Sequence, residues 1–268
     1  MTREAIQSRN NVRVFGKGTK TIVFAHGFGC DQQVWHKITP AFEEDFQIVV
    51  FDYVGSGHSD KSAYSSERYG TPAGYAADLM DICEAFDLTN VIFVGHSISG
   101  VIGLLASITN PSLFDKLCLI GPSPRYINEP GYAGGFDKED IDELMEMMER
   151  NYKEWVKYLA PIASKNSDRP ALTEEFEKIL MANDQHIVRQ FCEMTFTIDV
   201  REELEKVKTP SVILQAKEDS IVPLEIAHYL HSKLQNSELV LMEATGHNPH
   251  LSYPEETIHH IKSFIGVQ

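Results

Sequence analysis

The feature that most constrains the fold of this chain is a regular alternation of short apolar runs with longer amphipathic stretches. The apolar runs cover residues 48–52, 91–95, 117–121, 212–216 and 239–243. Most of them are continuous, as strands are when both faces of their sheet are covered. Between two of them, residues 74–86 carry apolar side chains at three- and four-residue spacing, which indicates a helix. The pattern predicts an α/β fold with a mostly parallel, doubly wound sheet.

Two segments depart from this alternation. Near the start, residues 12–15 and 21–25 have strand character and flank a Gly-Lys-Gly turn, so we expect a hairpin-like opening. From residue 124 to residue 200 no strand-like run occurs, and apolar residues recur with helical spacing. We therefore expect a core formed by residues 1–123 and 201–268. Residues 124–200 are expected to form an all-helical cap subdomain inserted between two strands.

Composition narrows the classes of function. A chain of 268 residues that is 43% hydrophobic can bury a full core. Its formal charge is -15 and no cluster of Lys and Arg stands out, so nucleic acid is not an expected partner. No apolar run approaches the roughly 18 residues of a membrane helix, which predicts a protein without a membrane partner. The four cysteines lack CxxC spacing and are expected to be reduced thiols of a cytoplasmic protein.

A serine stands at a position of special interest, at the end of the second apolar run. The sequence there is Gly-His-Ser-Ile-Ser, and Ser97 lies at the corner between the strand and a helix predicted over residues 98–108. A sharp corner of this kind, a nucleophile elbow, exposes a serine hydroxyl at the carboxyl edge of the sheet. The usual GxSxG pattern has glycine where this chain has Ser99, the next smallest residue that suits the turn. Taken alone, the pentapeptide is compatible with a nucleophile or with a helix N-cap.

Later parts of the chain supply the partners that a nucleophilic serine needs, a base and an acid that orients the base. Asp219 and His247 follow the last two apolar runs, which gives the chain order Ser, Asp, His. Glu218 is an alternative acid, but Asp219 directly precedes Ser-Ile-Val-Pro and is preferred. His96 and His250 are interpreted as structural. The predicted chemistry, attack on an ester carbonyl, requires neither a metal nor an organic cofactor.

Backbone amides complete the predicted site. The N–H of Phe28 follows the strand-like residues 21–25 and can point to the same place as the N–H of Ile98. Two such donors would stabilise the oxyanion of a tetrahedral intermediate. His26 is interpreted as a packing residue, and Asp52 as a residue that holds the glycine-rich turn after it by side-chain hydrogen bonds.

These residues occur within longer stretches that resemble the α/β-hydrolases over the whole chain. More narrowly, the chain resembles the family of the bacterial sigma-B stress regulator RsbQ and the plant strigolactone and karrikin receptors. The resemblance is carried by AHGFGCDQQVW at 25–35, FDYVGSGHSD at 51–60, GPSPRYIN at 121–128, GGFDKEDI at 134–141 and GHNPHLSYPEET at 246–257. The last stretch is most similar to the bacterial regulator, whereas the SPRY tetrapeptide and Ser99 are more similar to the plant receptors.

The resemblance implies a four-helix cap over a small, largely apolar pocket with Ser97 at its floor. The candidate pocket residues are Phe28, Phe136, Trp155, Phe191 and Phe196, and the last four could instead pack the cap helices together. The resemblance also implies a small hydrophobic ligand or ester substrate. It further implies a protein partner, which for the bacterial regulator is a PAS-domain phosphatase.

Two classes of function therefore stay open. The chain is either a signalling serine hydrolase of the esterase type, acting in a general stress response, or a metabolic carboxylesterase whose only partner is its substrate. A ligand-binding receptor with little turnover is a third alternative.

Overall fold

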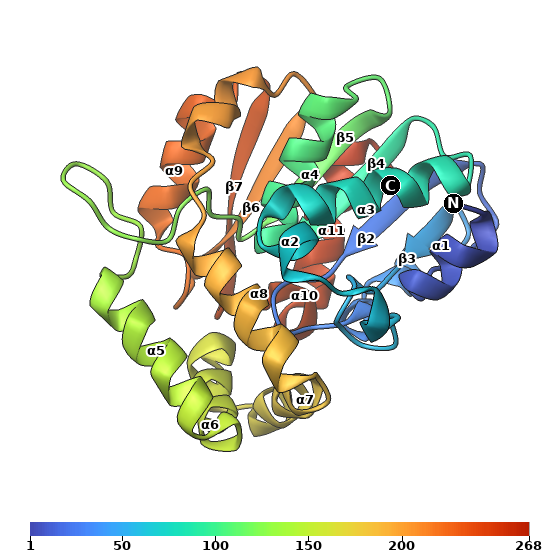
Figure 1. Cartoon of the computed structure of the whole chain (residues 1–268). Coiled ribbons are helices and arrows are strands. Elements are labelled where there is room, and N and C mark those ends of the chain that lie inside the picture. Colours follow the sequence, from blue (N-terminus) through green and yellow to red (C-terminus); the bar gives the residue numbers. More distant parts are fainter. Residues whose placement is uncertain (268) are drawn as a thin grey trace.

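A seven-stranded, mostly parallel sheet forms the centre of the computed structural model, which describes residues 1–267 (Figure 1). The strands are β1 (Arg13–Phe15), β2 (Lys20–Ala25), β3 (Phe46–Val50), β4 (Val91–His96), β5 (Phe114–Ile120), β6 (Ser211–Glu218) and β7 (Ser237–Thr245). Their order is β1-β3-β2-β4-β5-β6-β7, and every neighbouring pair is parallel except β1 with β3. The prediction of a mostly parallel, doubly wound sheet is confirmed.

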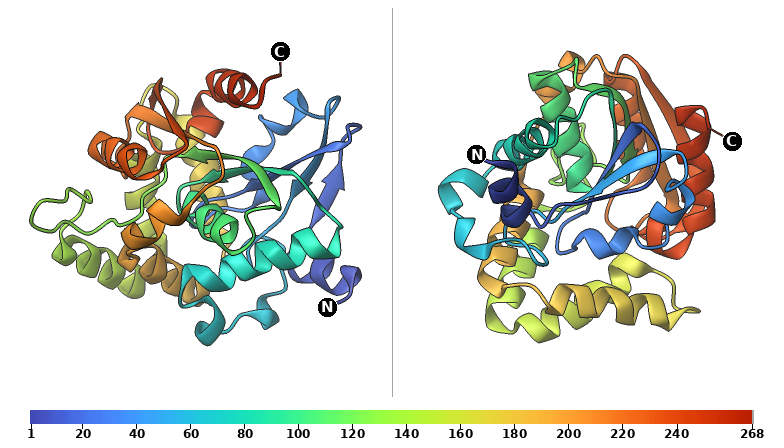
Figure 2. Two further views of the ribbon diagram at one scale, coloured as in Figure 1. Left: turned by 90° about the horizontal axis from the view of Figure 1, so that it is seen from above. Right: turned by 90° about the vertical axis from the view of Figure 1, so that its right-hand side faces the viewer.

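Helices cover both faces of this sheet, as its continuous apolar strands require. Helices α3 (Pro72–Ala85) and α4 (Ile98–Thr109) lie on one face, and α11 (Pro254–Ile265) lies on the other (Figure 2). The other helices of the core are α1 (Arg3–Arg9), α2 (Ser66–Tyr69), α9 (Leu224–Lys233) and α10 (Pro249–Ser252), with 3-10 turns η1 (Gln32–Trp35), η2 (Thr39–Ala41), η3 (Lys61–Ala63) and η4 (Arg201–Lys206).

The prediction of a hairpin at the start of the chain is wrong. Strand β1 pairs with β3, with Val14 opposite Val49, and β2 lies on the other side of β3. The Gly-Lys-Gly turn packs against the segment that leads into β3, where a Cβ on Gly18 would lie 1.9 Å from the Asp45 carbonyl oxygen. Glycine at this turn therefore allows close packing against a segment that is distant in the sequence. A local turn pattern cannot reveal such a contact.

Between β5 and β6 the chain forms four helices, which lie together at one end of the sheet (Figure 1). They are α5 (Lys138–Arg150), α6 (Tyr152–Ser164), α7 (Pro170–Met181) and α8 (Gln185–Thr197). The two ends of the insertion meet, because the N–H of Val200 donates to the Pro124 carbonyl at 3.0 Å and Arg125 forms an ion pair with Asp199 at 2.7 Å. The insertion therefore leaves and re-enters the core at neighbouring points.

The cysteines and the helix lengths bear on two further predictions. All four cysteines, Cys30, Cys83, Cys118 and Cys192, are free and buried, and burial raises the pKa of the Cys118 thiol to about 12. Within residues 1–267 no helix combines the length and the apolar character needed to cross a bilayer. The cytoplasmic location stays a prediction.

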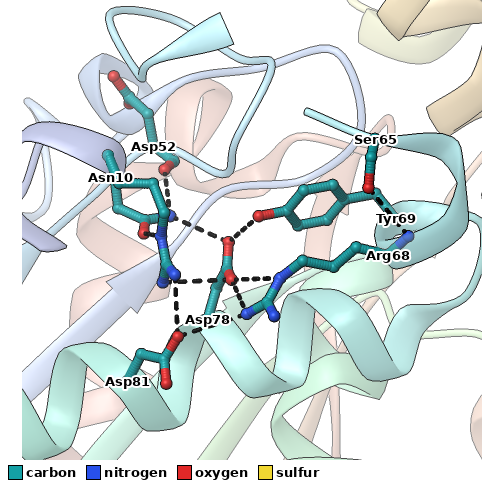
Figure 3. A network of polar contacts seen from close by, with 8 residues as sticks. Asn10, Asp52, Ser65, Arg68, Tyr69, Asp78 and Asp81 are labelled. Carbon is teal, nitrogen blue, oxygen red and sulfur yellow. Dashed lines mark hydrogen bonds and ion pairs between the residues drawn. The ribbon is translucent and has the colours of Figure 1, made fainter. Parts of the chain in front are cut away.

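A buried ionic network ties α1 to α3 (Figure 3). The carboxylate of Asp78, fully buried on α3, accepts hydrogen bonds from Arg68 Nη2 at 2.6 Å and from the Tyr69 hydroxyl at 2.9 Å. Arg9 lies 3.2 Å from the same carboxylate and 2.9 Å from Asp81. The Arg9 side chain is only 8% exposed, so its charge depends on these carboxylates for compensation.

Replacement of Asp78 by alanine should lower the free energy of unfolding by about 3 to 5 kcal/mol, because the buried charge of Arg9 loses its fully buried partner. Urea unfolding of the purified variant measures the loss. Asp81→Ala is the matched comparison, since the Asp81 side chain is 36% exposed, water can partly replace it beside Arg9, and its loss should therefore cost clearly less. Equal losses in the two variants would contradict this account of the network.

Candidate active site

Ser97 stands at the corner where β4 ends and α4 begins. Its backbone has φ 57° and ψ -124°, a conformation that a residue with a side chain rarely adopts. The N–H of Ser97 donates to the carbonyl of Ile120 at the end of the neighbouring strand β5, at 2.8 Å, and this bond holds the corner in place. Such strain is often found at functional sites. The serine is therefore held at the carboxyl edge of the sheet, as the elbow motif predicts.

A continuous chain of hydrogen bonds connects Ser97 with His247 and Asp219. His247 Nε2 lies 2.9 Å from Ser97 Oγ, and His247 Nδ1 lies 2.8 Å from Asp219 Oδ2. A carboxylate can only accept hydrogen bonds, so Nδ1 carries the proton of the neutral ring and Nε2 presents its lone pair to the serine. The imidazole is thus oriented to accept the hydroxyl proton.

Asp219 is itself held by backbone amides. Its Oδ1 accepts hydrogen bonds from the N–H groups of Ile221 at 2.8 Å and Val222 at 3.0 Å. The neighbouring Glu218 points elsewhere and forms an ion pair with Lys165 at 3.0 Å. Of the two adjacent carboxylates, the structure brings Asp219 and not Glu218 to the histidine.

The two amides proposed as oxyanion donors lie beside this corner. Strands β2 and β4 are neighbours in parallel register, with Ala25 opposite Gly95, so the turns that follow them emerge side by side. A Cβ on Gly27 would lie 3.3 Å from Ser97 Cβ, which places the turn that carries Phe28 against the serine. Among the described residues, the N–H groups of Phe28 and Ile98 have no hydrogen-bond acceptor. Both donors are available to a ligand.

The departure from GxSxG at Ser99 has a structural explanation. The fully buried Ser99 hydroxyl donates to the carbonyl oxygen of His26 and lies 2.9 Å from the Tyr53 hydroxyl. His26 Nε2 accepts the N–H of Tyr53 at 3.1 Å, so this histidine has the packing role that we expected. Ser99 therefore links α4 to the turn that carries Phe28. Asp52 also has its expected role, because it accepts the N–H of His58 at 2.9 Å within the loop that follows it.

A cavity between the core and the cap contains Ser97 in its wall. The lining residues are Phe28, His96, Ser97, Tyr126, Leu159, Ala163, Phe176, Thr195, Phe196, Ile221, His247 and Asn248. The volume of the cavity is about 30 Å³, room for about two water molecules. The cavity suits a small, largely apolar molecule.

Three of the five predicted pocket aromatics do not line this cavity. Phe28 and Phe196 line it, whereas Trp155 and Phe191 pack behind Phe28 at ring-centroid distances of 6.2 and 5.7 Å. Phe136 packs behind Phe196 at 5.5 Å. These three side chains form a second layer behind the aromatic rings that line the cavity.

Sequence reasoning also missed a tyrosine at the centre of the site. The Tyr126 hydroxyl lies 3.4 Å from Ser97 Oγ, and the residue is fully buried. Burial raises the pKa of this phenol well above its ordinary value, so the hydroxyl stays protonated and can donate. Its position in GPSPRYIN, directly after an apolar strand, is the signal that could have identified it.

The cap contacts both loops that carry the partners of Ser97. The N–H of His247 donates to the Ala163 carbonyl at the end of α6 at 2.8 Å, and Ser220 Oγ donates to the Ile162 carbonyl at 2.6 Å. Gly246 has φ 81°, and a Cβ there would lie 2.0 Å from the Ser164 carbonyl oxygen. Only glycine permits this approach, so the cap and the loop that carries His247 are closely fitted.

Two further buried histidines surround the site, as predicted for structural residues. His96 Nε2 donates to the His247 carbonyl at 2.7 Å, and His250 packs between His96 and Trp35 with ring centroids 4.4 and 4.7 Å away. Burial, followed by the influence of His247 and Lys37, lowers the pKa of His250 to about 3. His250 is therefore neutral in the folded protein at all moderate pH values.

Replacement of His250 by phenylalanine should reduce the sensitivity of the fold to acid. Between about pH 6.5 and pH 3 the unfolded chain binds a proton at His250 that the folded chain does not, so the free energy of unfolding falls as the pH is lowered. From pH 7 to pH 5 this effect amounts to about 2 kcal/mol, and phenylalanine abolishes it.

Urea unfolding of both proteins at the two pH values measures the difference. His259→Phe is the control, because water solvates that exposed ring in both states. If the acid-induced loss is as large in His250→Phe as in the unmodified chain, the explanation is wrong.

The described residues 1–267 contain no group of three or more His, Cys, Asp or Glu side chains arranged to hold a metal ion. At the cavity, Ser97, His247 and Asp219 form a hydrogen-bonded series beside two amides without an acceptor.

Comparison with known proteins agrees with the fold. The model of the family described as alpha/beta hydrolase fold matches residues 20–254. The chain belongs to the alpha/beta hydrolase family. The predicted fold class is confirmed.

Individual relatives are similar along nearly the whole chain. A karrikin insensitive 2 receptor from Petunia hybrida is 39% identical over 94% of this chain and 94% of its own. A strigolactone esterase from Arabidopsis thaliana is 38% identical over 96% of each chain. Among solved structures, a hydrolase from Oleispira antarctica is 37% identical, covers 100% of this chain and 98% of its own, and superposes with a TM-score of 0.97.

Proposed function

We propose that this chain is a serine hydrolase that cleaves small, largely apolar esters. The observation that carries the proposal is the unbroken series of hydrogen bonds from Ser97 Oγ through His247 to Asp219, in which Ser97 and His247 line a cavity beneath the cap. Membership of the alpha/beta hydrolase family and similarity to a protein named as an esterase support it.

In the proposed reaction, Ser97 Oγ attacks the ester carbonyl while His247 Nε2 takes the hydroxyl proton. The carbonyl oxygen becomes an oxyanion, which the N–H groups of Phe28 and Ile98 stabilise. The protonated His247 then gives its proton to the departing alcohol, which leaves an acyl group on Ser97. A water molecule repeats the sequence, with His247 again as base, and releases the acid.

The surroundings favour this chemistry. The side chains of Ser97 and His247 are almost completely buried, so few water molecules compete for the amide donors and the hydrogen bonds act in a medium of low polarity. The Tyr126 hydroxyl is a further donor within reach of the reacting oxygen. The cavity is narrow, so it accepts only a small acyl or alcohol group unless the cap moves outward.

The purified protein should hydrolyse p-nitrophenyl acetate and should be labelled by a fluorophosphonate at Ser97, because the paired imidazole activates this hydroxyl. Release of p-nitrophenol and mass spectrometry of the labelled peptide measure the two effects. Folded protein that stays unlabelled at Ser97 would refute the proposal. A label on another serine would refute the choice of nucleophile.

A second candidate function is that of a ligand receptor, in which the same cavity binds a small hydrophobic molecule and a protein partner detects the state of the cap. Relatives named as karrikin insensitive 2 receptors, at 39% and 40% identity, favour it. The contacts of α6 with Ser220 and His247 give a physical route, since any shift of the cap must disturb the loops beside Ser97. The PAS-domain phosphatase and the general stress response rest on the sequence resemblance alone.

A further inference from the structure

Three side-chain polar atoms of residues in the cavity wall have no hydrogen-bond partner among residues 1–267. One is Nδ1 of His96, a ring whose Nε2 is bonded to the His247 carbonyl. The other two are the hydroxyl oxygen of Thr195, on α8, and the side-chain amide nitrogen of Asn248, directly after His247. The two residues are 2% and 5% exposed. Proteins rarely leave buried polar groups unpaired, because such groups lose their hydrogen bonds to water without replacement. Both residues line the cavity.

The position of Thr195 in a helix does not explain why its hydroxyl lacks a hydrogen-bond partner. Thr197, two residues later on α8, donates its hydroxyl to the carbonyl four residues before it, at 2.7 Å, which is the common arrangement for threonine in a helix. Thr195 makes no such bond. Valine has the same shape and would pack against the apolar wall without an unpaired hydroxyl, so packing alone does not account for threonine at this position.

The side chain of Asn248 also does not form the hydrogen bond that its position at a helix start suggests. It is the N-cap residue of α10, where an asparagine side chain usually accepts a backbone N–H, but it makes no such bond. The helix is instead held by the Asn248 backbone carbonyl, which accepts the N–H of Leu251 at 3.0 Å. The side-chain amide is left as a hydrogen-bond donor at the cavity, one residue from the proposed catalytic base.

We propose that Thr195 and Asn248 form a polar subsite for an oxygen atom of the substrate other than those of the ester group. The inference rests on the hydrolase function proposed above and specifies its substrate class: small esters with an apolar body and a second oxygen, as a hydroxyl or carbonyl. The amide nitrogen of Asn248 can only donate and so requires an acceptor, while the Thr195 hydroxyl can donate or accept. Apart from His96, Tyr126 and the Ser97–His247 pair, the rest of the wall is apolar and offers no partner to a polar atom.

The test compares two esters that differ by one oxygen, p-nitrophenyl butyrate and p-nitrophenyl 3-hydroxybutyrate. For each, kcat/KM is divided by the rate of hydrolysis by hydroxide, which removes the difference in intrinsic reactivity. The unmodified protein should prefer the hydroxylated ester by about 10-fold, because a site with buried polar groups discriminates against a ligand that leaves them unpaired. Thr195→Val and Asn248→Leu should each reduce this preference several-fold, and the double variant should bring it close to one.

Thr197→Val is the matched control, since its hydroxyl is exposed on the same helix and outside the cavity, and the preference should be unchanged. No preference in the unmodified protein, or a preference that survives in the double variant, overturns the subsite while leaving the hydrolase function intact. If a variant does not fold, the proposal is tested by whether the unmodified protein prefers the hydroxylated ester.

A binding measurement separates the subsite from the chemistry. Butyramide and 3-hydroxybutyramide lack the activated ester, and their dissociation constants can be compared by calorimetry. If the protein hydrolyses neither of these esters nor p-nitrophenyl acetate, the proposed function fails. The subsite proposal is then tested by whether the hydroxylated amide binds about 10-fold more tightly and loses this advantage in Thr195→Val.

Discussion

Replacement of Ser97 by alanine is expected to reduce ester hydrolysis by about 10⁴-fold or more, because the variant lacks the atom that attacks the carbonyl. The fold should be retained. The serine side chain contacts only His247 and Tyr126 through hydrogen bonds, and alanine tolerates the backbone conformation about as well as serine does. The measurement is the release of p-nitrophenol, with the melting temperature as a check of folding.

Ser107→Ala is the control for this experiment. Ser107 is also buried on α4, but its hydroxyl donates to the Leu104 carbonyl at 2.7 Å and does not reach the cavity. Its hydrolysis rate should match that of the unmodified protein. Activity of Ser97→Ala within 10-fold of the unmodified rate would mean that another group performs the attack. Retained ligand binding in this variant would also permit a test of whether occupancy, rather than turnover, alters the cap.

The sheet and the order of the site residues could be predicted because both depend on local sequence. Continuous apolar runs identify strands that are covered on both faces, and residues that directly follow parallel strands meet at one edge of the sheet. For this reason Ser97, Asp219 and His247 could be placed together from positions 122 and 28 residues apart in the sequence, as their 2.9 and 2.8 Å contacts now show. The β1 pairing was mistaken because it depends on a long-range contact with β3.

The lining of the cavity could not be predicted, because helical periodicity identifies a buried face without showing what that face meets. Trp155 and Leu159 both lie on the buried face of α6, yet Leu159 lines the cavity and Trp155 packs behind Phe28. The spacing of apolar residues also gives no information about the polar residues between them. Thr195 and Asn248 were therefore missed, although their unpaired atoms make them the most informative residues of the wall.

Replacement of Asp219 by asparagine should reduce turnover by about 10⁴-fold while preserving the fold. The amide N–H groups of Ile221 and Val222 point at one oxygen of the side chain, so the asparagine must place its own oxygen there. Its NH₂ group then faces His247 Nδ1 and donates to it, which forces the ring proton onto Nε2. A protonated Nε2 cannot accept the proton of Ser97. His247 therefore no longer acts as the base, although the positions of the atoms are nearly unchanged.

The matched control for this change is Glu218→Gln, next to it in the chain. The side chain of Glu218 is exposed and contacts Lys165 rather than the histidine, so its loss should change the rate of p-nitrophenyl acetate hydrolysis by less than about 2-fold. The kinetic measurement on both variants, with melting temperatures for folding, separates the two carboxylates. A large loss in Glu218→Gln with a small loss in Asp219→Asn would show that the wrong carboxylate was assigned. Similar large losses in both would point to disruption of the loop between β6 and α9 rather than to the tautomer of His247.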